Sequence, residues 1–322
     1  MTVRTGELTV TRVRGVRVGH AESEGSPTGV TALVFDRPSP TVVDVRGGAS
    51  CTYDTASLSL DATFGRRWAI FFSGGSVFGL DAGRGIRTRV LEAGGGHTVF
   101  GNPTRVAPIS GATLFDLPGA DGTIPDYTPI GYAAAANASR GVVPMGQVGA
   151  GAGAWVGKYL GRDRAMPGGI GSAALLLPGR HALGVLVILN SVGAVRDPSN
   201  GRWIAGARGR NGRIVPPGER KGVPRARAGD GRGTNLLALV TDIGLPRAAL
   251  QRLAVQAGSG LAQVVAPVHT ATDGDVTFAT CTEESSARAP LGSRFTEMDA
   301  LGHEAAELVK RAAIHAVTAT GP

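Results

Sequence analysis

The 322-residue chain lacks the features that mark several classes of protein. It has two cysteines, Cys51 and Cys281, so neither a disulfide framework nor a cysteine-rich metal site is predicted. Aromatic residues make up only 5% of the chain, and lysine occurs only at 158, 221 and 310. The richest apolar stretch, residues 182–189, is far shorter than the roughly 20 residues that a membrane span needs. We therefore expect no membrane partner.

The sequence also offers no convincing cofactor site. Its six histidines are scattered, with no H-x-x-x-H pair, so we expect no metal. Residues 149–154 match the glycine pattern of a dinucleotide site, but no acidic residue follows at the required distance of about 20 positions. The first seven residues contain no apolar run, so we expect no signal peptide and a cytoplasmic protein.

Glycine and positive charge are the two excesses. The 50 glycines follow no G-X-Y period, and a hydrophobic fraction of 42% argues against disorder. Of the net charge of +8, most lies in residues 201–233, which hold nine basic residues and two acidic ones. This Arg-rich segment could belong to a non-enzymatic module that binds nucleic acid or protein. Because the rest of the chain is close to neutral, we instead expect a solvated linker at about 196–233 and no nucleic-acid partner.

Apolar patterns predict a layered α/β protein. Continuous or alternating apolar runs indicate strands, and two of these runs form a hairpin around residues 178–181. Helical spacing indicates a helix after Pro246 and a last helix capped by Thr296. Strands that alternate with helix pairs are typical of layered α/β folds. The expected strands are 8–13, 31–35, 41–45, 68–72, 172–177, 182–189, 234–241, 264–268 and 276–281, and two further helices are expected at 77–92 and 130–139.

The junction between Gly233 and Thr234 is the feature of the sequence that could carry out a reaction. A charged, glycine-rich segment ends there, and a strongly apolar strand begins at once. Thr234 could simply be the first residue of that strand. Alternatively, its hydroxyl could attack the carbonyl of Gly233, and hydrolysis of the resulting ester would leave a chain that begins at Thr234. The new α-amine, with an ordinary pKa of roughly 7.7–8.0, could then serve as the base that a threonine nucleophile needs.

Several segments carry a resemblance to a known family. They are Gly19-His, Pro27-Thr-Gly, Val45-Arg-Gly-Gly-Ala, Gly75-Ser-Val-Phe-Gly-Leu-Asp-Ala, Gly233-Thr-Asn-Leu-Leu-Ala-Leu-Val-Thr-Asp and His269-Thr-Ala-Thr-Asp-Gly-Asp-Val-Thr-Phe-Ala. The sequence resembles the DmpA-type P1 peptidases, the L-aminopeptidase/D-esterase family, which includes nylon-oligomer endo-hydrolases and β-aminopeptidases.

This resemblance implies a fold and a form of processing. The implied fold is a four-layer αββα sandwich of the DmpA and ornithine acetyltransferase type, similar to N-terminal nucleophile hydrolases. One domain over residues 1–322 would cleave itself into 1–233 and 234–322, and the two chains would stay associated. The resemblance further implies a homo-oligomer, and no cofactor.

The resemblance also assigns roles to acidic residues. Asp273 and Asp275 match an acidic turn that faces the nucleophile Thr234 in the nylon-oligomer branch. One carboxylate would orient the amine of Thr234, and the other would carry a proton. The plain alternative is that Asp-Gly here only makes a hairpin turn.

Three more residues match family positions. Lys158 would hold the aspartates ionised, although it could be a solvated loop lysine. Asn190 would donate to the oxyanion, although it could merely end a strand. Phe115 matches a substrate-pocket tyrosine but lacks the hydroxyl.

The sequence thus favours a self-processing amide hydrolase that acts on a small amide, a peptide or an amino-acid oligomer. An acyltransferase of the ornithine acetyltransferase type, which uses the same threonine ester, is the alternative enzyme.

Overall fold

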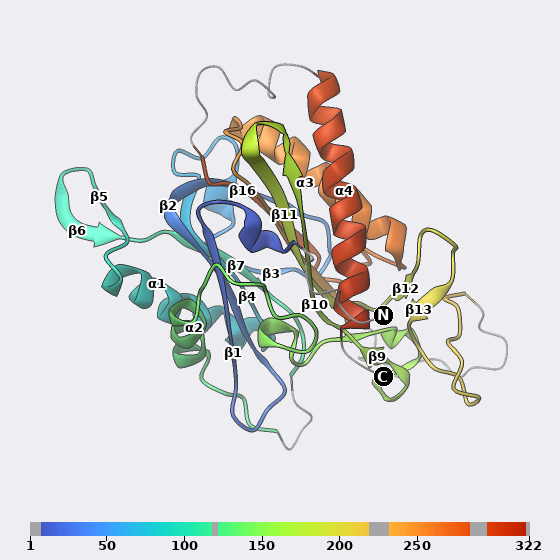
Figure 1. Cartoon of the computed structure of the whole chain (residues 1–322). Coiled ribbons are helices and arrows are strands. Elements are labelled where there is room, and N and C mark those ends of the chain that lie inside the picture. The colour runs from blue at the N-terminus through green and yellow to red at the C-terminus, as the bar shows by residue number, and fades with distance from the viewer. Residues whose placement is uncertain (1–7, 118–121, 219–231, 284–294, 320–322) are drawn as a thin grey trace.

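A large mixed sheet organises the molecule. The computed structural model describes residues 8–117, 122–218, 232–283 and 295–319 (Figure 1). In this part of the chain, the main sheet follows the order β10-β11-β14-β16-β2-β4-β7-β3, and β1 pairs with β2. The strands are β1 (Val16–Glu22), β2 (Gly29–Val45), β3 (Cys51–Tyr53), β4 (Arg66–Ser73), β7 (Ile109–Thr113), β10 (Gly169–Leu177), β11 (His181–Asn190), β14 (Thr234–Thr241) and β16 (Val276–Cys281).

Strand β2 joins two layers of this sheet. Its first half pairs with β1 and β4, and its second half pairs with β16. The prediction of separate strands at 31–35 and 41–45 was wrong, because one strand continues through Pro38 and Pro40. A register shift between Val34 and Ser39 accommodates the prolines, which cannot donate to a ladder.

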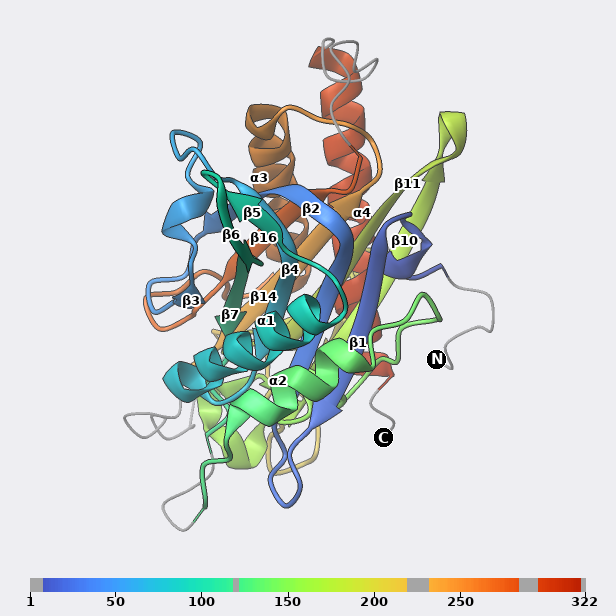
Figure 2. The same ribbon diagram turned by 90° about the vertical axis from the view of Figure 1, so that its left-hand side faces the viewer.

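Helices cover both outer faces (Figures 1 and 2). Helices α1 (Ala82–Glu92) and α2 (Tyr127–Ala136) pack on the strands around β1 and β2, whereas α3 (Arg247–Val264) and α4 (Phe295–Thr318) pack on the opposite side. Three apolar clusters fill the spaces: one beneath α1 and α2, one between the strand layers, and one beneath α3 and α4. The fold is therefore the expected αββα sandwich.

Glycine explains how closely these layers approach. A Cβ atom added to Gly171 of β10 would lie 1.8 Å from the carbonyl oxygen of Ala312 in α4. A Cβ on Gly131 of α2 would lie 2.2 Å from the carbonyl oxygen of Ala82 at the start of α1. The glycine excess thus serves tight packing between elements.

Several other expectations were confirmed and a few corrected. The structure confirms the type of most expected elements, although their bounds shift by a few residues. These elements are the hairpin of β10 and β11, the strands β4, β14 and β16, and all four helices. The expected strand at 8–13 is instead a short 3-10 helix, Val10–Arg12, in which the N–H of Val13 donates to the carbonyl oxygen of Val10 at 3.1 Å, and β1 was missed. Of the expected strand at 264–268, Val264 ends α3 and only Val265 and Ala266 form a strand, β15. Thr296 lies one residue inside α4, and its side chain is outside the described residues.

The first part of the expected linker is well defined. This part contains β13 (Trp203–Ala205), which pairs with β12 (Ala194–Arg196), whereas residues 219–231 lie outside the described residues. The remaining short strands are β5 (His97–Val99), β6 (Asn102–Val106), β8 (Trp155–Val156), β9 (Met166–Pro167) and β15 (Val265–Ala266). No helix in the described ranges is both long and apolar enough to cross a bilayer.

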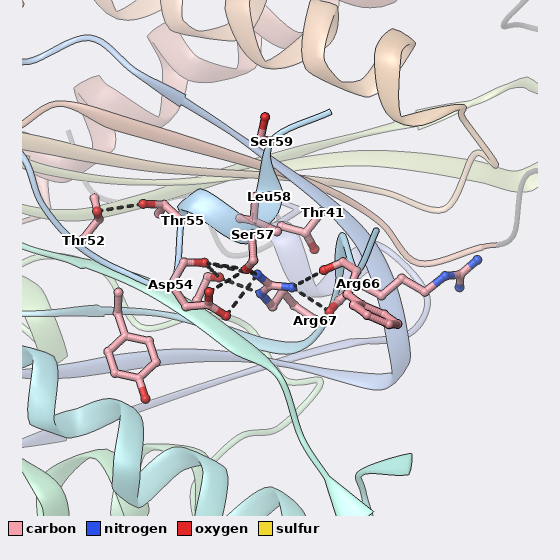
Figure 3. A network of polar contacts seen from close by, with 12 residues as sticks. Thr41, Thr52, Asp54, Thr55, Ser57, Leu58, Ser59, Arg66 and Arg67 are labelled. Carbon is pink, nitrogen blue, oxygen red and sulfur yellow. Dashed lines mark hydrogen bonds and ion pairs between the residues drawn. The ribbon is translucent and has the colours of Figure 1, made fainter. Parts of the chain in front are cut away.

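A buried arginine fastens the start of β4 (Figure 3). The Arg67 side chain is 1% exposed and donates to Ser110 Oγ at 2.6 Å, to the carbonyl oxygen of Phe64 at 3.0 Å and to Asp54 Oδ2 at 3.2 Å. It also donates to the Ser57 hydroxyl. Ser110 belongs to β7, and the other three acceptors lie in the segment between β3 and β4, so one side chain ties that segment to the sheet.

The register of the central strands brings the predicted site together. Asn190 at the end of β11 lies opposite Thr234 at the start of β14. Strand β14 runs parallel to β16, with Leu236 opposite Val276. The Asp273–Asp275 turn, which precedes β16, therefore lies beside Thr234.

Candidate active site at the Gly233–Thr234 junction

The Thr234 hydroxyl donates to the carbonyl oxygen of Gly233, the residue whose carbonyl it was predicted to attack. Thr234 is 4% exposed, and its Oγ1 lies 2.6 Å from the carbonyl oxygen of Gly233. That oxygen also accepts a hydrogen bond of 2.9 Å from the backbone N–H of Gly274. The carbonyl therefore has a fixed donor in place where negative charge would develop during attack.

Gly233 is confined by its neighbours. A Cβ atom at this position would lie 2.4 Å from Asp273 Oδ1 and 2.5 Å from the backbone nitrogen of Val192. The junction forms an isolated parallel bridge with Asp273. Glycine is needed here because neighbouring atoms approach the backbone too closely for a side chain.

Asp273 has one carboxyl oxygen that can still form a hydrogen bond. Its Oδ2 accepts from the N–H of Thr270 at 2.9 Å, whereas its buried Oδ1 has no hydrogen-bond partner. Burial raises the pKa of the Asp273 carboxyl above its ordinary value, and the negative charge of Asp275 raises it further. A carboxyl of this kind can accept and release a proton next to Thr234.

Asp275 has a different, fully bonded environment. Its Oδ1 accepts from the backbone and side-chain N–H groups of Asn235 at 2.7 and 3.0 Å. Its Oδ2 lies 3.0 Å from the backbone nitrogen and 2.7 Å from Nδ1 of His269. Through these contacts Asp275 holds the residue after Thr234 in place.

Lys158 is a buried cation rather than a solvated loop lysine. It is 5% exposed, and its Nζ donates to the backbone oxygen and to Oδ1 of Asn190 at 2.7 and 2.8 Å. Burial lowers the pKa of the Lys158 ammonium to about 7, and the negative charge of Asp273 opposes that shift. Lys158 therefore acts electrostatically on the Asp273 end of the site.

Asn190 is held in one orientation. Its Oδ1 also accepts from the N–H of Trp155 at 3.1 Å, and its Nδ2 donates to the carbonyl oxygen of Phe115 at 3.0 Å. Since a primary amide has two N–H groups, one of them remains for a substrate oxygen.

A small cavity of about 180 Å³ adjoins these residues and includes Phe115, Lys158 and Asn190 in its walls. A larger cavity of about 750 Å³ lies beside the Arg67 network and contains none of the predicted site residues. The described residues contain no group of three His, Cys, Asp or Glu side chains placed to hold a metal ion.

Glycines from a distant segment support the acidic turn. A Cβ on Gly47 would lie 2.2 Å from the carbonyl oxygen of Asp273 and 2.2 Å from the nitrogen of Asp275. The N–H of Gly47 donates to the carbonyl oxygen of Asp275 at 3.2 Å. The Val45-Arg-Gly-Gly-Ala motif thus follows from the packing of two backbones against each other.

The structure brings Thr234, Gly233, Asp273 and Asp275 together, and it places Lys158, Asn190 and Phe115 beside them. Sequence reasoning gave no role to Gly274, Asn235 or His269. All three lie in the motifs that carry the family resemblance, so their position was visible but their contacts were not.

Comparison with known proteins identifies the family. Residues 9–322 match the model of peptidase family S58. An uncharacterized aminopeptidase of Mycobacterium tuberculosis is 31% identical, with 97% of this chain and 94% of that protein covered. A 6-aminohexanoate-oligomer endohydrolase of Kocuria sp. is 30% identical over 90% of this chain and 81% of its own length.

Solved structures show the same fold. A β-aminopeptidase of Burkholderia sp. superposes with a TM-score of 0.67 at 24% identity, covering 97% of this chain and 86% of its own. The L-aminopeptidase D-Ala-esterase/amidase of Ochrobactrum anthropi, a variant of the Ntn hydrolase fold, gives a TM-score of 0.69 at 20% identity with the same coverage. The chain therefore has the N-terminal nucleophile (Ntn) hydrolase fold, is an amide hydrolase, and belongs to peptidase family S58.

Proposed function

We propose that this protein cleaves its own Gly233–Thr234 bond and then hydrolyses amide bonds through an ester on Thr234. The observation that carries the proposal is the 2.6 Å approach of Thr234 Oγ1 to the Gly233 carbonyl oxygen, together with the Gly274 N–H that binds the same oxygen. A nucleophile beside a carbonyl that already has a fixed donor is arranged for acyl transfer.

Self-cleavage requires one proton to move. Thr234 Oγ attacks the Gly233 carbonyl carbon, and the oxyanion accepts from the Gly274 N–H. The C–N bond breaks as the proton passes, by way of Asp273, from the hydroxyl to the leaving nitrogen. Water then hydrolyses the ester, which gives a carboxylate on Gly233 and restores the hydroxyl and the free amine of Thr234.

The processed site repeats this chemistry on a substrate. The α-amine of Thr234 takes the hydroxyl proton, and the spare N–H of Asn190 donates to the substrate oxyanion. Lys158 keeps negative charge on Asp273, which orients the amine. The leaving nitrogen takes the proton, and water releases the acid. The relatives named for peptide and 6-aminohexanoate-oligomer hydrolysis support an amide of a peptide or an amino-acid oligomer as the substrate.

A pair of variants at Thr234 tests the proposal. Wild type should give two fragments on a denaturing gel, and the small one should begin Thr-Asn-Leu-Leu. Thr234→Ala should stay as one inactive chain, because it has no hydroxyl, whereas Thr234→Ser should still cleave. Amide hydrolysis by Thr234→Ala, or a different fragment terminus, would contradict the proposal. Release of free acid in the presence of added ornithine distinguishes hydrolysis from acyl transfer to ornithine.

A further inference from the structure

His269, four residues before Asp273, has a left-handed backbone conformation with a φ of 56°. This conformation costs free energy for a residue that carries a side chain, and such strain often lies at functional sites. Here it brings two groups of one residue to the same atom. The backbone nitrogen and the ring Nδ1 of His269 lie 3.0 and 2.7 Å from Asp275 Oδ2. The strained backbone therefore serves this one contact.

The polar contacts of the His269 ring are directed at Asp275. Nδ1 faces Asp275 Oδ2, whereas the buried Nε2 has no hydrogen-bond partner among the described residues. The other three contacts of this carboxyl group come from N–H groups, so we assign the ring hydrogen to Nδ1, which donates to Asp275. The ring thus orients the carboxyl group by hydrogen bonding.

The backbone of Asp275 is held independently of His269. Its carbonyl oxygen accepts from the N–H groups of Arg46 and Gly47 at 3.0 and 3.2 Å. The orientation of its carboxyl group depends instead on His269 and Asn235. Loss of the ring should therefore release the carboxyl group without displacing the turn that carries it.

Asn235 connects this carboxyl group to the nucleophile. Its backbone and side-chain N–H groups donate to Asp275 Oδ1 at 2.7 and 3.0 Å. Because Asn235 directly follows Thr234, these bonds fix the backbone one residue beyond the reacting hydroxyl. A cut before Thr234 removes the covalent restraint on its other side, so the anchor at Asn235 would then matter more.

We propose that His269 is a positioning residue for Thr234: it orients the Asp275 carboxyl group, which holds Asn235 and thereby the nucleophile. His269 acts through Asp275 and not on the reacting atoms. This inference rests on the proposed self-cleavage, and it deepens that proposal by extending the site to a residue outside the acidic turn.

Two amide variants test which ring nitrogen matters. In His269→Asn the amide N–H can replace Nδ1–H, and asparagine tolerates the left-handed backbone, so self-cleavage should stay close to the wild-type rate. In His269→Gln the longer side chain carries the amide to the position of Nε2 instead, and self-cleavage should slow roughly tenfold or more. Denaturing gels of timed samples from cell-free synthesis measure both rates without any external substrate.

A glycine variant separates positioning from folding. His269→Gly relieves the backbone strain but removes the ring, so it should melt close to wild type and still cleave slowly. Added imidazole should restore part of its rate. His181→Ala is the matched control, because His181 Nδ1 lies 3.3 Å from Oδ1 of the buried Asp242, just beyond the opposite end of β14. It should cleave at the wild-type rate.

The outcomes separate the two proposals. If wild type is cut before Thr234 and His269→Gln and His269→Gly cleave equally fast, the positioning role is wrong and self-cleavage stands. The role is also wrong if His269→Asn is as slow as His269→Gln, or if His181→Ala is as slow as His269→Gly. If wild type stays uncut, the proposed self-cleavage fails, and the positioning role fails with it.

Discussion

Two aspartates that look equivalent in the sequence differ sharply in their bonding. Asp275 uses both oxygens to accept from Asn235 and His269, whereas Asp273 has a buried oxygen with no partner. The first arrangement positions the backbone after Thr234, and the second leaves a group free to move a proton. The structure thus supports different roles for the two aspartates, which their spacing in the sequence could not distinguish.

Asparagine substitutions should separate these two roles. Asp273→Asn keeps an oxygen for the Thr270 N–H, so its melting temperature should match or exceed that of wild type while self-cleavage falls at least tenfold. Asp275→Asn places N–H groups opposite other N–H groups, which should cost about 1–3 kcal/mol of folding free energy as well as cleavage. Thermal melting and a time course on denaturing gels measure both effects. Equal losses of stability in the two variants would contradict the division.

Asp116 should make stability depend on pH. Burial raises the pKa of its carboxyl from 3.8 to about 6, so the folded state holds the proton more tightly than the unfolded state does. Its contribution to stability is therefore complete below pH 3.8 and is lost as the pH rises to about 6.

Asp116→Asn, studied in an uncut Thr234→Ala background, cannot ionise and keeps an oxygen for the Gly75 N–H. Relative to Thr234→Ala alone, its free energy of unfolding should rise between pH 4 and pH 7 by roughly 3 kcal/mol, the equivalent of about two pKa units. Urea denaturation at the two pH values measures this change. A difference that stays constant with pH would show that Asp116 ionises normally in the fold.

At the scale of elements, Gly47, just after the end of β2, packs against the acidic turn at Asp273–Asp275. Gly47→Ala should force the turn away from Thr234, because its Cβ would lie 2.2 Å from backbone atoms of Asp273 and Asp275. We expect slower self-cleavage and a loss of about 1–3 kcal/mol in the free energy of unfolding.

Gly258→Ala in α3 is the matched control. Its new Cβ would have no neighbour closer than 3.6 Å, so it should keep full cleavage and gain about 0.5–1 kcal/mol from the better helix former. Cleavage gels and urea denaturation compare the two variants. Normal cleavage by Gly47→Ala would show that the turn can shift without loss.

At the scale of the whole molecule, the proposed small chain is the centre of the fold. Strand β14 lies between β11 and β16, and every residue of β14 is buried. Its helices α3 and α4 pack on each other and cover one face. A cut at Gly233–Thr234 therefore leaves all of these contacts in place.

The two fragments should consequently remain together after self-cleavage. They should co-elute in size-exclusion chromatography in native buffer and separate only in denaturant, because pulling out β14 would expose two strand edges. Separate native peaks would contradict this expectation. The elution volume also measures the homo-oligomer, which stays a prediction.

The sequence by itself determined most of the buried strands and the family, and it predicted Thr234 as the nucleophile. Those properties are local, since an apolar run, an Asp-Gly-Asp turn or a Gly-Thr junction can be recognised from adjacent residues. Prediction from the sequence failed where strand pairing outweighed the local residue pattern, as in the single strand β2, which continues through Pro38 and Pro40.

Only the tertiary structure decided how the groups of the candidate site are bonded to one another. It placed a backbone N–H of Gly274 on the Gly233 carbonyl, left Asp273 Oδ1 free, and set Arg162 beside Trp155 at the cavity. These relations join segments that are far apart along the chain. Their distances follow from strand register and close glycine packing, which no spacing in the sequence encodes.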